Sequence, residues 1–156
     1  MENLEINTNQ SKILTGSHDL NNWLEGGYET GVITLLYGPP ASGKSNFAIM
    51  TSCHQAKKDK KIVFIDTEGS FSIDRVKQIS GGVPEFILKN IVILKPVNFN
   101  EQKTCFYKLS RDFKSKNIGL IIVDSITMLY RLDLAEARKK GIEQIKRINS
   151  DLANQM

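Results

Sequence analysis

The stretch GPPASGKS, residues 38 to 45, constrains the fold more than any other part of this sequence. It matches the pattern G-x-x-x-x-G-K-[ST], in which consecutive backbone N–H groups wrap a phosphate and glycines allow close approach. The preceding run VITLLY (32–37) is short, apolar and rich in β-branched residues, which predicts a buried strand. We expect a helix over about 43–58, with its N-terminus at the phosphate. A Pro/Gly turn that happens to precede a helix is the alternative, and the strand–loop–helix context disfavours it.

The motif assigns a role to several of its own residues. Lys44 is expected to reach the β- and γ-phosphates as a point charge, and Ser45 to place its hydroxyl on Mg²⁺. The expected nucleotide-binding residues of this segment are Gly38, Pro39, Pro40, Ala41, Ser42, Gly43, Lys44, Ser45 and Asn46.

Three more apolar runs, at 61–66, 91–94 and 118–124, alternate with segments of helical periodicity. The expected helices lie near 73–79, at about 100–115 and at 142–154, with a further helical turn at Pro84. Strands that are nearly all apolar and alternate with helices predict an α/β fold, in which helices cover both faces of a mostly parallel sheet. We expect one domain over 1–156, with a short helix and loop at 12–30 and a loose segment at 1–11.

Ligands on such sheets bind at the carboxyl ends of the strands, and three of these ends are polar. The first leads into the phosphate loop, the second into Asp66-Thr67-Glu68-Gly69, and the fourth into Asp124-Ser125, so we expect one shared crevice. Asp124 is suited to order the water shell of Mg²⁺, although an aspartate can also simply cap a strand end. Glu68 could orient an attacking water, or it could cap the helix that begins near residue 72. The residues alone leave both readings of Glu68 open.

Composition excludes some classes of protein and leaves others open. The net charge of +4 is compatible with nucleic acid as a partner, and equally with an ordinary soluble protein. Two cysteines, Cys53 and Cys105, and two histidines show no zinc-binding spacing, so we expect reduced thiols in helices. The lysine-rich run 57–61 is typical of a solvated turn, with nucleic-acid contact as the alternative. No apolar run reaches the length of a membrane span and the polar start is no signal peptide, so a cytoplasmic location is expected.

Five motifs in order carry a resemblance to a known family. Thr15-Gly16, Gly26-Gly27, the phosphate loop, FIDTEGSF (64–71) and IIVDS (121–125) resemble the RecA/RadA recombinases. The phosphate loop alone is shared with many unrelated ATPases, whereas DTEGSF together with IIVDSITMLYR is much more specific. The similarity runs from about residue 12 to the last residue. The phosphate loop begins by residue 38, so we expect no N-terminal helix–hairpin–helix domain before it, and the likeness is greatest to the short archaeal paralogues of RadA.

The resemblance implies roles for residues of this chain. Glu68 corresponds to the family's catalytic glutamate, which activates the attacking water, and Lys44 of the phosphate loop is the other expected catalytic residue. Arg75 falls where the family places an arginine over the adenine base, with a solvated helix arginine as the alternative.

The resemblance also implies a DNA-binding segment. Tyr130 and Arg131 match the pair that leads into the first DNA-binding loop, and Arg138 and Lys139 follow in a basic segment that could grip phosphates. A charged surface turn is the alternative for this segment.

The function implied is that of a RecA-like ATPase with ATP and Mg²⁺ as cofactors. Such a protein binds DNA, hydrolyses ATP weakly and assists homologous recombination and repair. The implied partners are DNA, the main RadA-like recombinase and other recombination or repair proteins, with possible self-association and no membrane. One alternative is a KaiC-like signalling ATPase that does not act on DNA. Another is an interaction module that holds nucleotide as a structural ligand.

The sequence departs from the family's pattern at its C-terminal end. The resemblance predicts a further strand after the helix at 142–154, ending in a threonine–asparagine–glutamine motif, and then the second DNA-binding loop. Neither is present in the sequence. In RecA-like folds that strand lies between the phosphate-loop strand and the strand that ends in Asp124. We therefore expect a fragment of a longer protein, with a gap in its sheet and two unpaired strand edges.

Overall fold

A three-stranded parallel sheet lies at the centre of the computed structural model, which describes residues 11–82, 85–112 and 117–156. Its strands are β3 (Lys61–Asp66), β4 (Ile91–Leu94) and β5 (Ile118–Asp124), in the order β4–β3–β5. In the register, Ile62 pairs with Ile91 on one side and with Leu120 on the other. These bounds confirm the three strands predicted at 61–66, 91–94 and 118–124.

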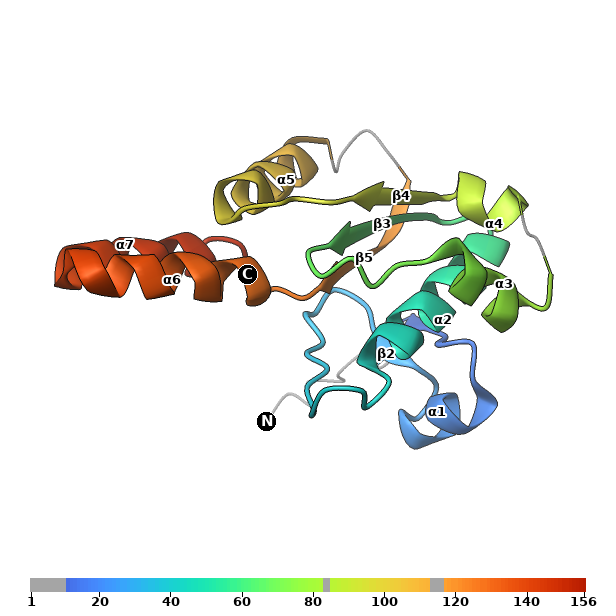
Figure 1. Ribbon diagram of the computed structural model, residues 1–156. Helices are drawn as coiled ribbons and strands as arrows, with labels where there is room; N and C mark the ends of the chain where they lie inside the picture. The colour runs from blue at the N-terminus through green and yellow to red at the C-terminus, as the bar shows by residue number, and fades with distance from the viewer. Residues whose placement is uncertain (1–10, 83–84, 113–116) are drawn as a thin grey trace, which may run out of the picture.

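Helices cover both faces of this sheet (Figure 1). On one face pack α2 (Lys44–Lys57), α3 (Ile73–Ser80) and α4 (Glu85–Lys89), around the buried side chains of Ile62 and Phe64. On the other face packs α5 (Phe99–Asp112), against Val63 and Ile65. Alternate residues of β3 thus point into two different cores, which is why residues 62–65 in the middle of the strand are all apolar. The predicted α/β fold is confirmed.

The helices α6 (Met128–Lys140) and α7 (Ile142–Ala153) form a hairpin that projects from the sheet (Figure 1). Its core contains Leu129, Ala137 and Ile148, together with Phe99 of α5. The helix expected at 142–154 is therefore confirmed. The prediction of a loop after the fourth strand is wrong, because the residues of this segment are helical up to Lys140. The segment is rich in Leu, Ala, Arg and Lys, which are good helix formers, and pairing with α7 buries its apolar stripe.

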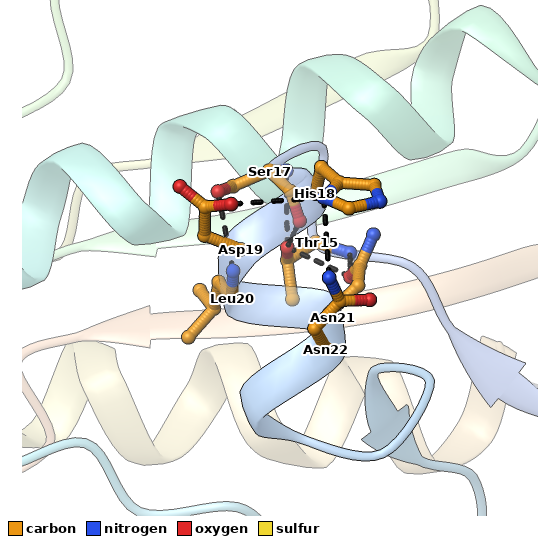
Figure 2. A network of polar contacts seen from close by, with 7 residues as sticks. All are labelled: Thr15, Ser17, His18, Asp19, Leu20, Asn21 and Asn22. Atoms are coloured by element: carbon orange, nitrogen blue, oxygen red, sulfur yellow. Dashed lines mark hydrogen bonds and ion pairs between the residues drawn. The ribbon is translucent and has the colours of Figure 1, made fainter.

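The N-terminal part packs a small antiparallel pair, β1 (Lys12–Ile13) with β2 (Tyr28–Glu29), around α1 (His18–Trp23). The short helix expected in 12–30 is confirmed, whereas the strand pair was not predicted. Figure 2 shows how Thr15 organises this region. Its backbone N–H and its hydroxyl donate to Asn21 Oδ1 at 2.8 and 2.9 Å, and Ser17 Oγ caps α1 by accepting from Leu20 N at 3.3 Å.

The predicted strand at 32–37 is wrong, because these residues have no regular secondary structure. Their side chains are exposed, with Ile33 at 73% and Tyr37 at 88% of full exposure. A strand persists only where a neighbour pairs its N–H and C=O groups. The resemblance predicts that another strand separates this run from β5, and no segment of the described chain supplies that strand. β5 pairs with β3 alone among the described strands, as expected for an open edge.

Some expectations lie outside the described residues. They are residues 1–10 of the loose segment expected at 1–11, and the end of the helix predicted at 100–115. The helical turn predicted to start at Pro84 is confirmed by α4, which begins at Glu85, although Pro84 itself lies outside the described residues. Cys53 and Cys105 are confirmed as free thiols within helices α2 and α5. Across the described ranges, every helix is too short or too polar to span a bilayer.

Candidate nucleotide-binding site

The phosphate loop leads directly into α2, as the sequence predicted, although no strand precedes it. Gly43 is the N-cap residue, with φ of +89°, and Ala41 also has a positive φ of +62°. Left-handed residues in a turn are typical of backbone concavities that bind anions. The first turn of α2 contains no acidic side chain, and the N-cap makes no side-chain hydrogen bond. The loop therefore presents backbone donors and the positive end of the helix dipole, which suits a phosphate.

Lys44 closes the loop on itself. Its Nζ donates to the carbonyl oxygens of Gly38 and Pro39 at 3.0 and 2.9 Å. Ser42 Oγ lies farther away, at 3.5 Å. The ammonium group is thus held beside the loop, where an anion bound there would attract it. Asn46, the last residue of the predicted set, is exposed in the first turn of α2.

A short hydrogen bond joins the phosphate loop to the end of β5. Ser45 Oγ donates to Asp124 Oδ2 at 2.6 Å, across 79 residues of sequence. A hydroxyl and a carboxylate are hard oxygen ligands of the kind that Mg²⁺ prefers, with nucleotide phosphates and waters completing its shell. No cluster of three or more metal-binding side chains occurs in the part of the chain that the structure describes. The pair fits a metal that arrives with a nucleotide rather than one held by protein ligands alone.

Glu68 lies beside the same strand end. Its Oε1 accepts a hydrogen bond from Ser125 Oγ at 2.6 Å, and its side chain is exposed to solvent. Two more bonds join the loop to the strand: Thr67 Oγ1 donates to Ser125 O at 2.8 Å and accepts from Ser125 N at 2.9 Å. The structure therefore brings Glu68, Asp124 and the phosphate loop together at the carboxyl ends of the strands, as predicted. The capping role that the sequence left open belongs instead to Ser72, which accepts from Arg75 N at 3.1 Å.

Asp66, at the end of β3, anchors the loop that carries Glu68. Its side chain is fully buried, with Lys95 Nζ at 3.9 Å. Its two carboxylate oxygens accept from the backbone N–H groups of Ser70 and Phe71 at 2.9 and 3.2 Å. This burial and bonding give Asp66 a structural role, which is to fix the turn that carries Glu68.

The remaining predicted residues lie on helices. Arg75 is exposed on α3, and its guanidinium donates to Gln78 Oε1 at 3.1 Å. Tyr130 joins the two helices of the hairpin, because its hydroxyl donates to Asn149 Oδ1 at 2.9 Å and its ring contacts Phe99 edge-on. Arg131, Arg138 and Lys139 are exposed on α6. Lys139 pairs with Glu136 at 2.7 Å, and the hydrogen bond from Lys139 lowers the pKa of Glu136.

Sequence reasoning assigned no role to three polar residues of this site: Thr67, Ser70 and Ser125. Ser70 Oγ donates to Asp124 Oδ2 at 2.7 Å, the same oxygen that Ser45 contacts. All three residues lie within or beside the quoted motifs, and this proximity was the available signal. Their pairing joins residues more than 50 positions apart, so it depends on strand order rather than on spacing.

Comparisons with known proteins show the family of this chain. The family described as Rad51 matches residues 7–155. The DNA repair and recombination protein RadB of Methanococcus maripaludis strain C7 is 42% identical over 135 residues, which are 86% of this chain and 61% of the relative. RadB of Methanocaldococcus jannaschii is 40% identical over 133 residues (85% and 60%), and RadB of Methanobrevibacter smithii is 37% identical over 147 residues (93% and 59%).

These relatives are of the short archaeal kind that the motifs indicated. The chain spans about 60% of their length. The family match extends over nearly the whole sequence, including the phosphate loop, the DTEGSF segment and the strand that ends in Asp124. The chain belongs to the Rad51 family.

Proposed function

We propose that this protein binds Mg·ATP at the carboxyl ends of the strands, where the phosphate loop meets Asp124. The observation that supports the proposal is the 2.6 Å contact between Ser45 and Asp124, because it brings the residues expected to hold the metal side by side. The loop backbone from Gly38 to Gly43 and Lys44 would hold the phosphates. Ser45 would contact Mg²⁺ directly and Asp124 partly through water. Arg75 would leave Gln78 and stack on the adenine base. Its hydrogen bond to Gln78 costs little to break, because it lies on an exposed surface.

The same site supports slow hydrolysis of the bound ATP. Mg²⁺ would neutralise charge that develops on the phosphates, and Glu68 would orient the attacking water. The side chain of Glu68 is exposed, and among the described residues one hydroxyl holds it, through Oε1, so that its second oxygen could accept from water. Slow turnover is inferred from the family and not from these distances.

For the whole protein we propose a role in DNA repair and homologous recombination, in which it binds DNA and assists a RadA-like main recombinase. The names of the relatives support this role. So do the exposed cations Arg131, Arg138 and Lys139 on the projecting hairpin, which could contact DNA phosphates. Tyr130 would act indirectly, because it holds the two helices together.

Salt-dependent DNA binding tests this role. Affinity for DNA would be measured at two salt concentrations, with and without Mg·ATP. Binding that weakens steeply with salt supports the proposal. Arg131→Ala should weaken binding and reduce the log–log salt slope by about 0.7–0.9 if one phosphate contact is lost.

Lys89→Ala is the charge-matched control for Arg131→Ala. Lys89 ends α4, with one residue between it and β4, and so lies near the start of the strands, away from the carboxyl ends that form the site. An unchanged salt slope in Arg131→Ala would contradict the proposal that α6 contacts DNA. An absence of DNA binding at low salt, with nucleotide affinity intact, would instead favour the KaiC-like signalling ATPase.

A further inference from the structure

Ser70 joins the loop that carries Glu68 to the carboxylate that would order the metal. Its hydroxyl donates to Asp124 Oδ2 at 2.7 Å. The reverse connection also exists, since Ser125, which follows Asp124, donates to Glu68 at 2.6 Å. Each of the two loops therefore supplies a hydroxyl to the carboxylate of the other.

Asp124 is the preferred acceptor of the Ser70 proton. Asp66 Oδ1 is also within reach of Ser70 Oγ, but at 3.3 Å, and this oxygen already accepts from Ser70 N at 2.9 Å. A hydroxyl that bonds a carboxylate is strongest at about 2.5–2.7 Å. The shorter bond therefore takes the single proton of the hydroxyl, whereas the backbone bond to Asp66 fixes the loop.

Asp124 Oδ2 accepts two hydroxyls, those of Ser45 at 2.6 Å and Ser70 at 2.7 Å. If Ser45 turns to Mg²⁺, as its place in the phosphate loop implies, Ser70 remains as a protein donor that orients this carboxylate. Partners of this kind fix the direction of a metal-ordering group, and their loss typically costs about 10–100-fold in metal affinity.

We propose that Ser70 is a positioning residue that aims Asp124 at the metal of a bound Mg·nucleotide and couples the Glu68 loop to that metal. The proposal rests on the proposed function, because it requires the nucleotide site. It predicts that the hydroxyl of Ser70 matters for the contribution of Mg²⁺ to nucleotide binding and not for the phosphate loop itself.

The experiment measures the affinity of the purified protein for a fluorescent ATP analogue over a range of Mg²⁺ concentrations and in EDTA. For Ser70→Ala we expect unchanged affinity in EDTA, and a Mg²⁺ concentration for half-maximal enhancement that rises about 10-fold or more. Ser70→Thr keeps the hydroxyl and should restore the wild-type Mg²⁺ response. Ser110→Ala on α5 is the matched control, since that hydroxyl bonds Tyr107 O within its own helix.

Ser70→Ala retains the backbone bond to Asp66, so the loop should keep its fold, which a thermal melt checks. A wild-type Mg²⁺ response in Ser70→Ala overturns the proposal. So does an equal loss of affinity in EDTA and in Mg²⁺, because that pattern indicates a general structural role. If the wild-type protein binds no nucleotide at saturating Mg²⁺, the proposed function itself fails.

Discussion

Lys44 has no strong partner that would oppose its transfer to a phosphate. Within the described part of the chain, its Nζ donates only to oxygens of its own loop, two of them carbonyls at about 3 Å. Lys44→Ala should therefore weaken nucleotide binding about 10- to 100-fold, the loss expected for hydrogen bonds to a charged group. Calorimetric titration with an ATP analogue and Mg²⁺ measures the effect. Lys89→Ala should bind like wild type, and equal affinities in all three proteins would contradict the assignment of Lys44.

His54 makes the stability of the fold sensitive to acid. Among the described residues its Nε2 is buried without a hydrogen-bond partner, and burial, together with the positive charges of Lys58 and Lys57, lowers the pKa of His54. The unfolded chain thus binds the proton more tightly than the folded protein does. The free energy of unfolding should be undiminished above the ordinary histidine pKa of about 6.5, and should decline as pH falls from there through the lowered pKa.

His54→Gln should flatten this decline in urea unfolding measured from pH 8 to pH 5. His18→Gln is the control, since the imidazole of His18 is 86% exposed. A slope that persists in His54→Gln, or that disappears in His18→Gln, would show that other groups cause the acid sensitivity.

At the scale of elements, Gly27 allows β1 and β2 to pack closely. Its φ is +120°, and a Cβ at this position would lie 2.4 Å from the carbonyl oxygen of Ile13. Gly27→Ala combines a disfavoured backbone conformation with a backbone clash, so we expect it to destabilise the protein by about 2–4 kcal/mol. Chemical denaturation measures the change. Gly82→Ala, where a Cβ would meet open space, should cost less than about 0.5 kcal/mol, and similar values for the two variants would refute this account.

The sequence predicted elements well where periodicity and burial agree. β3 is buried by helices on both faces, β5 is mostly half-buried, and the predicted bounds of both strands are confirmed. Helix α7 shows a clear stripe in Ile145, Ile148 and Leu152. Helix α6 was missed because its stripe is interrupted by charges and is buried only against α7. The run 32–37 has strong strand propensity but no neighbour to pair with, so tertiary context overrides its local preference.

At the scale of the whole molecule, the sequence predicted where the candidate site lies but not which hydrogen bonds hold it together. The motif spacing located the phosphate loop, Glu68 and Asp124, because parallel strands bring their carboxyl ends to one edge. The hydroxyls of Ser70 and Ser125 could not be assigned, since their partners depend on which strands are neighbours. The sequence also contains nothing that distinguishes the buried Asp66 from the accessible Glu68, two residues apart.

The run 32–37 and the free edge of β5 together predict self-association of this chain. Ile33, Leu35 and Tyr37 are 71–88% exposed, and within the described part of the chain β5 is paired on one side only. An exposed strand-forming run and an open sheet edge are complementary between copies, since each supplies the backbone groups that the other lacks.

Sedimentation velocity over a range of concentrations should therefore show association that Ile33→Lys reduces, because a charge on such a run opposes edge pairing. Ile142→Lys is the matched control: Ile142 is 70% exposed, close to the 73% of Ile33, but it begins a helix outside the run. Association that survives Ile33→Lys, or that Ile142→Lys reduces equally, would place the contact elsewhere. A selective effect of Ile33→Lys would show that the segment leading into the phosphate loop retains its strand propensity and pairs with the open sheet edge of another copy.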